Sequence, residues 1–224
     1  MNEEQFLALR QQMVMEIAAN TVMAGERIGK YNLDMRVMEA VGKVPRHEFV
    51  PVELQAYAYL NRPLPIGFDK TISQPFIVAL MTDLLQIGDD DAVLEIGTGL
   101  GYQAAVLAEL ARKVYSVEMI DLLSAEAGKR LARAGYTNIE ISVRNGYFGW
   151  PEHAPFDKVM VTAAPELIPP PLINQLKPGG RMVIPAGLED SQQLMLVEKN
   201  TEGRLSTREI LPVRFSQLEG AEPI

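Results

Sequence analysis

A glycine-rich turn between an apolar run and a helical pattern carries the clearest chemical signal in the sequence. Residues 92–96 read as a buried strand, and Gly97, Gly99 and Gly101 follow it at alternate positions. Glycine lets the backbone turn tightly and approach a ligand closely, and the helix that follows offers free N–H groups in its first turn. The turn, with Thr98 inside it, therefore predicts a ligand-binding loop.

The spacing of the glycines indicates the class of ligand. The dinucleotide fingerprint places its third glycine one position later than Gly101, where this sequence has Tyr102, so a pyrophosphate ligand and an NAD-dependent reductase are disfavoured. Glu118 ends the next predicted strand, 21 positions after Gly97, and a carboxylate there can accept hydrogen bonds from both ribose hydroxyls. These features predict a nucleoside ligand without phosphate, and S-adenosylmethionine fits best. Glu95 adds a carboxylate near the expected methionine amino group.

The apolar patterns along the chain predict the elements that position this loop. Strands and helices alternate through the middle of the chain, which is typical of βαβ units in a parallel sheet. We expect strands at 92–96, 113–118, 139–143, 156–162 and 181–185, and helices at 102–112, 121–134 and 170–176. Two further strands, 193–198 and 208–215, flank a turn at 202–203 and predict a final antiparallel pair. The expected fold class is α/β, a doubly wound Rossmann-like sheet that is mostly parallel.

An N-terminal helical portion precedes this sheet. Apolar residues at helical spacing predict a helix over residues 3–24 that Gly25 ends, and a second short helix that begins near Asp34. Residues 56–75 are rich in Pro, Gly, Asn and Asp, and therefore read as a long irregular segment of the kind that is often functional.

The chain shows no repeat and no linker that would divide it. We therefore expect a single domain over residues 1–224, in which residues 1–75 form the helical and active-site loop portion and residues 76–224 the cofactor-binding sheet core.

Composition excludes several classes of function. The chain has 224 residues, no cysteine and two histidines, so thiolate nucleophiles and disulfides are excluded and we expect no metal site. Its net charge of −8 does not attract phosphate backbones, which argues against a nucleic-acid partner. No apolar run reaches membrane-spanning length and the start lacks signal-peptide features, so we expect no membrane partner and a cytoplasmic protein.

Several stretches resemble, in order along the chain, the protein-L-isoaspartate O-methyltransferase family. They are residues 44–51 (VPRHEFVP), 63–67 (PLPIG), 71–75 (TISQP), 97–105 (GTGLGYQAA), 154–157 (APFD) and 175–180 (QLKPGG). The resemblance extends over roughly residues 35–218, so chance is a poor explanation. It implies a methyltransferase sheet and S-adenosyl-L-methionine as the methyl donor.

The resemblance also implies a substrate, the isoaspartyl carboxylate of damaged peptides and proteins. Its methyl ester leads through a succinimide back towards aspartate, which makes the reaction a protein repair. A carboxylate is already ionised at neutral pH, so the enzyme has to position it rather than deprotonate it. Ser73 is implied to be the catalytic residue that orients the carboxylate, with Gln74 and Pro75 beside the cofactor. The alternative for Ser73 is an ordinary cap on a helix that Pro75 begins, where free N–H groups would favour an anion.

Two positions depart from the family pattern. The family usually has Gly-Asp-Gly after the third strand, where the Asp meets the adenine amino group, and this chain has Arg144-Asn145-Gly146. Asparagine keeps an acceptor oxygen, so we expect Asn145 to accept from the adenine and the Gly146 N–H to meet the ring. The family commonly has Asp at the position of Asn61.

Two rival functions remain open from the sequence. One is a methyltransferase of the same fold that acts on another carboxylate or on a small-molecule acceptor. The other is a non-catalytic protein that binds S-adenosylmethionine or a peptide without turnover.

Overall fold

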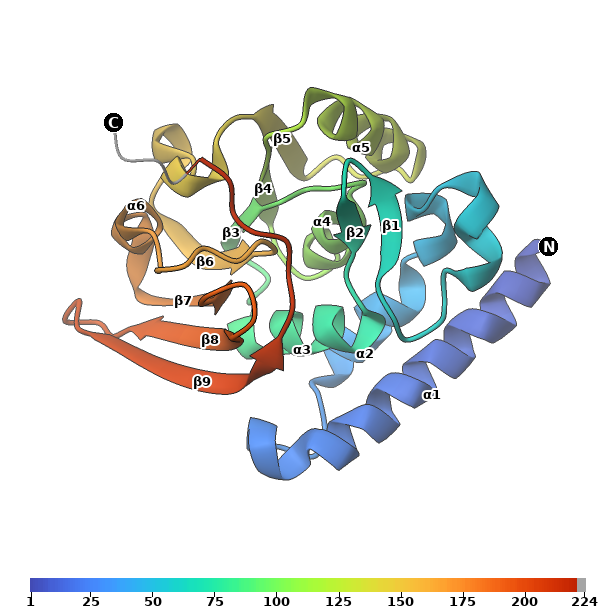
Figure 1. Cartoon of the computed structure of the whole chain (residues 1–224), viewed down its shortest axis with the longest axis horizontal. Coiled ribbons are helices and arrows are strands. Elements are labelled where there is room, and N and C mark those ends of the chain that lie inside the picture. The colour runs from blue at the N-terminus through green and yellow to red at the C-terminus, as the bar shows by residue number, and fades with distance from the viewer. Residues whose placement is uncertain (221–224) are drawn as a thin grey trace.

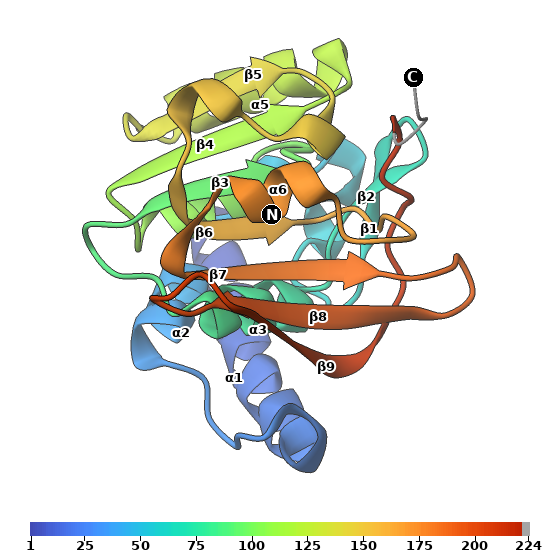
Figure 2. The same ribbon diagram turned by 90° about the vertical axis from the view of Figure 1, so that its left-hand side faces the viewer.

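The computed structural model describes residues 1–220 and contains one large sheet of seven strands in the order β5-β4-β3-β6-β7-β8-β9. The strands are β3 (Ala92–Ile96), β4 (Lys113–Glu118), β5 (Ile139–Val143), β6 (Phe156–Val161), β7 (Leu176–Ala186), β8 (Gln192–Lys199) and β9 (Leu205–Val213). Figure 1 and Figure 2 show β5 at one edge of the twisted sheet and β9 at the other.

The topology confirms the predicted doubly wound α/β fold. Strands β5 to β7 are parallel, and β8 and β9 add antiparallel pairs at the end of the sheet. The chain builds outward from β3 through β4 to β5, and then returns to the other side of β3 to add β6 and β7. The strand order therefore reverses between β3 and β6, and ligands bind at such a switch point, beyond the carboxyl ends of the strands.

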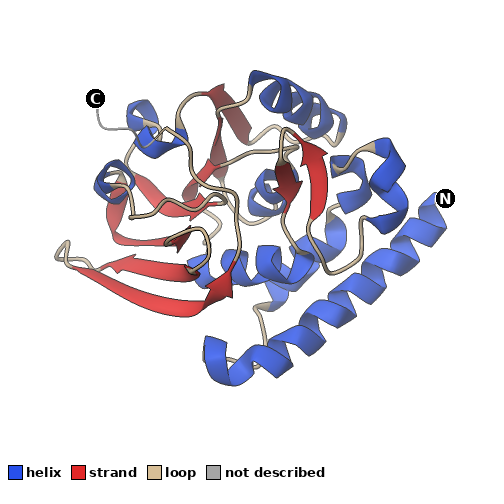
Figure 3. Cartoon of the chain, viewed as in Figure 1, coloured by secondary structure: helices blue, strands red, loops and turns tan. Residues whose placement is uncertain are grey.

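Helices cover both faces of the sheet (Figure 3). They are α1 (Glu3–Ile28), α2 (Met35–Lys43), α3 (Pro75–Leu85), α4 (Tyr102–Ala108), α5 (Asp121–Arg133) and α6 (Pro170–Asn174). Short 3-10 helices are η1 (Arg46–Phe49), η2 (Val52–Tyr57), η3 (Gly146–Phe148) and η4 (Pro151–His153). Among residues 1–220, no helix is both long and apolar enough to cross a lipid bilayer.

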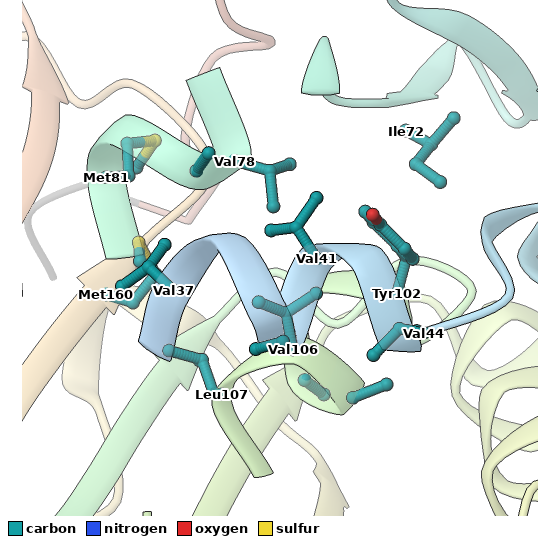
Figure 4. Packing of buried hydrophobic residues seen from close by; sticks show 14 of the residues in the cluster. Val37, Val41, Val44, Ile72, Val78, Met81, Tyr102, Val106, Leu107 and Met160 are labelled. Atoms are coloured by element: carbon teal, nitrogen blue, oxygen red, sulfur yellow. The ribbon is translucent and has the colours of Figure 1, made fainter. Parts of the chain in front are cut away.

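The core divides into two clusters, one on each face of the sheet, because side chains alternate along a strand. In β3, Val93 belongs to the larger cluster, which α1 to α5 cover, whereas Leu94 and Ile96 belong to the smaller cluster beneath α6. Figure 4 shows side chains of α2, α3 and α4 meeting in the larger cluster. This alternation directs Glu95, between Leu94 and Ile96, toward the face that carries α3 and α4.

The first helix is longer than its sequence pattern predicts. Gly25 does not end it; α1 continues to Ile28 and ends at Gly29, which adopts a left-handed conformation with φ of 77°. Gly25 is buried inside the helix because the Tyr31 ring packs on it, and a Cβ atom there would lie 2.2 Å from that ring. The glycine therefore serves packing rather than termination.

Part of the segment predicted as irregular is a hairpin of β1 (Leu64–Gly67) and β2 (Lys70–Ile72). Leu64 pairs with Ile72 and both are buried. Buried and exposed side chains therefore alternate as they do in a strand, but over a stretch too short to predict one from the sequence. The turn residues Phe68 and Asp69 both have positive φ, at 54° and 55°. Asn-Gly or Asp-Gly is the usual signal for such a turn, and its absence hid the hairpin.

The other predicted elements are present with shifted ends. Helix α4 ends at Ala108, four residues before the predicted end, and β9 begins at Leu205, three residues before the predicted start. Strand β7 begins at Leu176 and includes the Pro178-Gly179-Gly180 stretch that the pattern places before the strand. The strand ends depend on ladder hydrogen bonds to neighbouring strands, which the sequence pattern does not report, and helix ends fray by one or more residues.

Candidate functional site

A cavity of about 500 Å³ lies beyond the carboxyl ends of β3, β4 and β6, at the switch point of the sheet. Its floor consists of residues at the strand ends and in the loops after them: Ile96, Gly97, Val117, Glu118, Thr162 and Ala163. The hairpin side contributes Ile66 and Lys70, and Ser73, Gln74 and Ile77 follow from the start of α3. The volume is that of a small-molecule site.

Only glycine fits at position 97 of the loop, because Thr162 lies against it. Gly97 has φ of 98°, and a Cβ atom there would lie 2.3 Å from the hydroxyl oxygen of Thr162. That hydroxyl lies within hydrogen-bond distance of the carbonyl oxygens of Ile96 and Gly97, at 3.0 and 2.9 Å. Thr162 therefore ties the loop to the end of β6. Its role was not predicted from the sequence, although a polar residue directly after the strand next to β3 is a usable signal.

The Glu118 carboxylate organises the loop from the neighbouring strand. It accepts hydrogen bonds from the backbone N–H groups of Gly99, Met119 and Ile120, at 2.8, 2.9 and 3.0 Å. Glu118 is 8% exposed and lines the cavity. Two carboxylate oxygens offer about four acceptor sites, so three backbone donors leave room for one further donor from a ligand.

Glu95 lies behind the cavity rather than on its wall. It is fully buried on the face of β3 toward α3 and α4, and one carboxylate oxygen accepts from the Ser116 hydroxyl, which also contacts Thr98. The other oxygen has no partner among the described residues. Burial raises the pKa of Glu95 to about 8, and the nearby Glu118 charge adds to the rise while the Ser116 hydrogen bond opposes it. Burial therefore favours the protonated form of this group.

Ser73 and Gln74 lie on the cavity wall between β2 and α3. The alternative role of Ser73, that of a helix cap, is wrong, because the residue at the N-cap of α3 is Gln74. Within residues 1–220 the Ser73 hydroxyl makes no hydrogen bond and is half-buried. It is therefore available to a ligand in the cavity.

The first turn of α3 offers fewer free donors than its sequence indicates. Pro75 starts the helix and has no N–H, and the Phe76 N–H donates to the Asn61 side-chain oxygen at 3.0 Å. Ile77, which lines the cavity, is then the first residue of the turn whose N–H remains for an anion.

The Arg144-Asn145-Gly146 stretch differs from expectation. Gly146 is buried on the cavity wall, but the Asn145 oxygen accepts from the Tyr147 N–H at 2.9 Å and caps η3, and the Asn145 amide donates to the Gly220 carbonyl at 3.2 Å. Asn145 is not on the wall. Arg144 donates to Glu152 at 2.8 Å and lies over the Trp150 ring.

The segment after β9 closes the cavity, and no sequence signal marked it. Residues 214–219, which we term the C-terminal strap, line the cavity together with Pro212 and Val213 at the end of β9. The Ala164 N–H donates to the Ser216 carbonyl at 2.8 Å, and the Leu218 N–H donates to the Ala164 carbonyl at 2.9 Å. Lys70 of the hairpin pairs with Glu219 of the strap at 2.6 Å.

The cavity thus gathers six of the site residues that the sequence predicted: Ser73, Gln74, Gly97, Gly99, Glu118 and Gly146. The other five do not line the cavity: Pro75, Glu95, Thr98, Gly101 and Asn145. Gly101, for example, caps α4, and a Cβ atom there would meet the Leu131 side chain at 3.1 Å. Among residues 1–220, no cluster of three or more His, Asp or Glu side chains is arranged to hold a metal ion.

Comparisons of the sequence with known proteins point to one family. The sequence profile described as protein-L-isoaspartate(D-aspartate) O-methyltransferase matches residues 17–222. Protein-L-isoaspartate O-methyltransferase 1 of Polaromonas sp. (strain JS666 / ATCC BAA-500) is 66% identical over 100% of this chain and 94% of its own length. Protein-L-isoaspartate O-methyltransferase 2 of Syntrophobacter fumaroxidans is 58% identical over 97% of this chain and 89% of its own.

Solved structures share the fold. One protein-L-isoaspartate O-methyltransferase superposes with a TM-score of 0.80 at 28% identity, over 94% of this chain but 66% of the solved chain. A putative protein-L-isoaspartate O-methyltransferase from Plasmodium falciparum, solved in complex with S-adenosyl-L-homocysteine, superposes with a TM-score of 0.73 at 21% identity. That superposition covers 91% of this chain and 97% of the solved one, and it supports the fold alone.

Proposed function

Because this chain belongs to the protein-L-isoaspartate(D-aspartate) O-methyltransferase family, we propose that it methylates isoaspartyl carboxylates in damaged peptides and proteins. The methyl donor is S-adenosyl-L-methionine. The observation that carries the proposal is that one cavity is lined both by the glycine loop with Glu118 and by Ser73. A donor site and an acceptor site therefore open into the same space.

The residues present fit this donor. Gly97 and Thr162 form a cradle that a Cβ atom would fill, and Glu118 keeps one acceptor site for a ribose hydroxyl. Apolar side chains of Ile120, Leu123 and Leu218 line the same cavity and suit an adenine ring. No third glycine stands at position 102 to favour a pyrophosphate.

The bound donor supplies a methyl group on a sulfonium, and the chain itself has to bind, orient and exclude water. The acceptor carboxylate is ionised at neutral pH, so a carboxylate oxygen would bond to the methyl carbon without a protein base while the methyl–sulfur bond breaks and the sulfur leaves as a neutral thioether. We assign Ser73 the role of donating its hydroxyl hydrogen to the other carboxylate oxygen, which holds the attacking oxygen in line. The hairpin and the C-terminal strap shield the cavity, which limits competing water.

A radiolabelled methyl-transfer assay tests the function. An isoaspartyl peptide should accept the methyl group, and its aspartyl twin of the same sequence should not. Ser73→Ala should lower kcat while leaving the affinity for S-adenosylhomocysteine unchanged, because the serine contacts only the acceptor. Methyl transfer to a small carboxylate but not to the peptide would favour another acceptor. Donor binding with no methylated product would favour a binding protein.

A further inference from the structure

Two side chains outside the cavity hold the short turn that carries Ser73. The Arg46 guanidinium donates through Nη2 to the Ser73 carbonyl at 2.7 Å, and the Asn61 Oδ1 accepts from the Phe76 N–H at 3.0 Å. The two contacts are three residues apart along the chain, one at the Ser73 carbonyl and one at the Phe76 N–H. The turn is therefore anchored at both ends.

The environment of Arg46 is unusual for an arginine. The residue is fully buried, and its Nε donates to the Ala58 carbonyl at 2.8 Å. Its guanidinium lies 4.8 Å from the centre of the Tyr102 ring, and no ion pair joins it to a carboxylate within residues 1–220. Burial lowers the pKa of Arg46 to about 10, with Tyr102 opposing the decrease, so the group stays charged at neutral pH.

Burying a charge without an opposite charge is unfavourable, and a packed apolar side chain would often stabilise the fold more. Arg46 instead gives its planar donors to two backbone carbonyls, those of Ala58 and Ser73, which belong to separate loops. A planar guanidinium that donates to two carbonyls fixes the relative position of those carbonyls more strictly than the flexible ammonium of a lysine would. The arginine is suited to fixing the Ser73 backbone.

Asn61 performs the matching task at the other end of the turn. Pro75 has no N–H, so Phe76 provides the first backbone donor of α3, and Asn61 takes it. Asn61 is partly exposed, so this contact can be removed without opening the core.

We propose that Arg46 and Asn61 are positioning residues that hold the Ser73–Phe76 turn so that the Ser73 hydroxyl meets the acceptor carboxylate in the cavity. This inference rests on the proposed function and on the role assigned to Ser73. Both residues act through Ser73, and neither touches the substrate.

Asn61 offers the cleaner test, and the full chain is used throughout. Asn61→Leu should lower kcat for the isoaspartyl peptide by about 10-fold or more, since small misplacements of reacting groups can reduce turnover up to about 100-fold. Its dissociation constant for S-adenosylhomocysteine, measured by calorimetry, should stay within about twofold of wild type because the donor contacts are untouched. Asn61→Asp keeps the acceptor oxygen and should have a kcat close to that of wild type.

A double-mutant cycle shows whether Asn61 acts through Ser73. In the Ser73→Ala background, Asn61→Leu should lower kcat by less than about twofold, because the hydroxyl that it positions is already gone. Independent effects that multiply would overturn the proposal. An unchanged kcat in Asn61→Leu, or in Ser73→Ala alone, would overturn it as well.

Arg46 is tested by two variants of different severity. Arg46→Lys keeps the charge but loses the planar pair of donors, so it should lower kcat and leave the affinity for S-adenosylhomocysteine near normal. Arg46→Met also removes the charge, and its melting temperature shows whether the fold tolerates the loss. Wild-type kcat in a folded Arg46→Lys would remove Arg46 from the proposal.

Asn138→Ala is the matched control. The Asn138 amide also bridges backbone carbonyls, those of Ala108 and Ala111 at 2.9 and 3.1 Å, but it lies away from the cavity. This variant should lower the melting temperature and keep kcat. The wild-type assay separates the two hypotheses: an inactive wild type refutes the proposed function, whereas an active wild type with active Asn61→Leu refutes only the positioning role.

Discussion

At the scale of single residues, environment separates two glutamates on adjacent strands. Glu118 at the end of β4 accepts three backbone N–H groups and faces the cavity. Glu95 in β3 is fully buried and accepts from one hydroxyl. Glu118 therefore presents its remaining acceptor site to a ligand. Burial opposes a charged carboxylate at Glu95, so this residue belongs to the core rather than to the ligand site.

Glu118→Gln should weaken S-adenosylhomocysteine binding. The substitution removes the charge and places an amide group against N–H donors such as that of Gly99, which disturbs the glycine loop as well as the ribose contact. A hydrogen bond to a charged group contributes about 1.5–3 kcal/mol, so affinity should fall by about 10- to 100-fold. Calorimetry measures this change in affinity. Glu126→Gln on the outer side of α5 is the control, and equal affinity in both variants would remove Glu118 from the site.

Glu95 should make stability depend on pH. Its pKa rises from the ordinary 4.5 to about 8 in the folded chain, so between these values the folded state keeps a proton that the unfolded state has lost. The stability contribution is therefore complete below pH 4.5 and is lost as pH rises toward 8. Glu95→Gln does not titrate, so its unfolding free energy relative to wild type should increase between pH 5 and pH 8.

Urea denaturation at several pH values measures this difference. Glu166→Gln, at an exposed position, provides the reference. If the difference between Glu95→Gln and wild type is the same at pH 5 and pH 8, Glu95 has an ordinary pKa and the assigned burial effect is wrong.

At the scale of elements, the cavity is enclosed by two segments that do not belong to the sheet. The β1–β2 hairpin precedes α3, and the C-terminal strap follows β9 (Figure 1). Two contacts bind the strap near its end, the Lys70–Glu219 ion pair and the Asn145 hydrogen bond to Gly220. These contacts restrain the strap at the edge of the cavity.

Lys70→Met should speed the release of S-adenosylhomocysteine. The Lys70 and Glu219 side chains are 26% and 56% exposed, and a pair of this kind contributes at most about 1 kcal/mol, so the dissociation rate should rise by up to about fivefold. Stopped-flow displacement measures the rate, and high salt should reduce the difference from wild type. Arg204→Met breaks the remote pair with Glu202 and should leave release unchanged. An unaltered rate in Lys70→Met would show that the ion pair does not restrain the strap.

At the scale of the whole molecule, we propose that the chain unfolds as one domain. The larger core cluster is continuous from Phe6 of α1 through Val93 of β3 to Ile210 of β9, so the N-terminal helices and the sheet share one interior. Heating followed by far-ultraviolet and near-ultraviolet circular dichroism should give coincident single transitions. S-adenosylhomocysteine should raise the midpoint of both, and NADH should not. A separate early transition for residues 1–75 would contradict the proposal.

The sequence by itself determined the parallel sheet, the glycine loop and Glu118, because each depends on residues close together along the chain. Strand and helix periods, and the spacing from Gly97 to Glu118, report local backbone and one βαβ unit. Residues that meet only after folding leave no such local pattern. Lys70 and Glu219 are 149 positions apart and Arg46 and Ser73 are 27 apart, and no period links either pair. The burial of Glu95, the closing of the cavity by the C-terminal strap and the anchoring of Ser73 were decided by tertiary packing, since they depend on which distant segments share a surface.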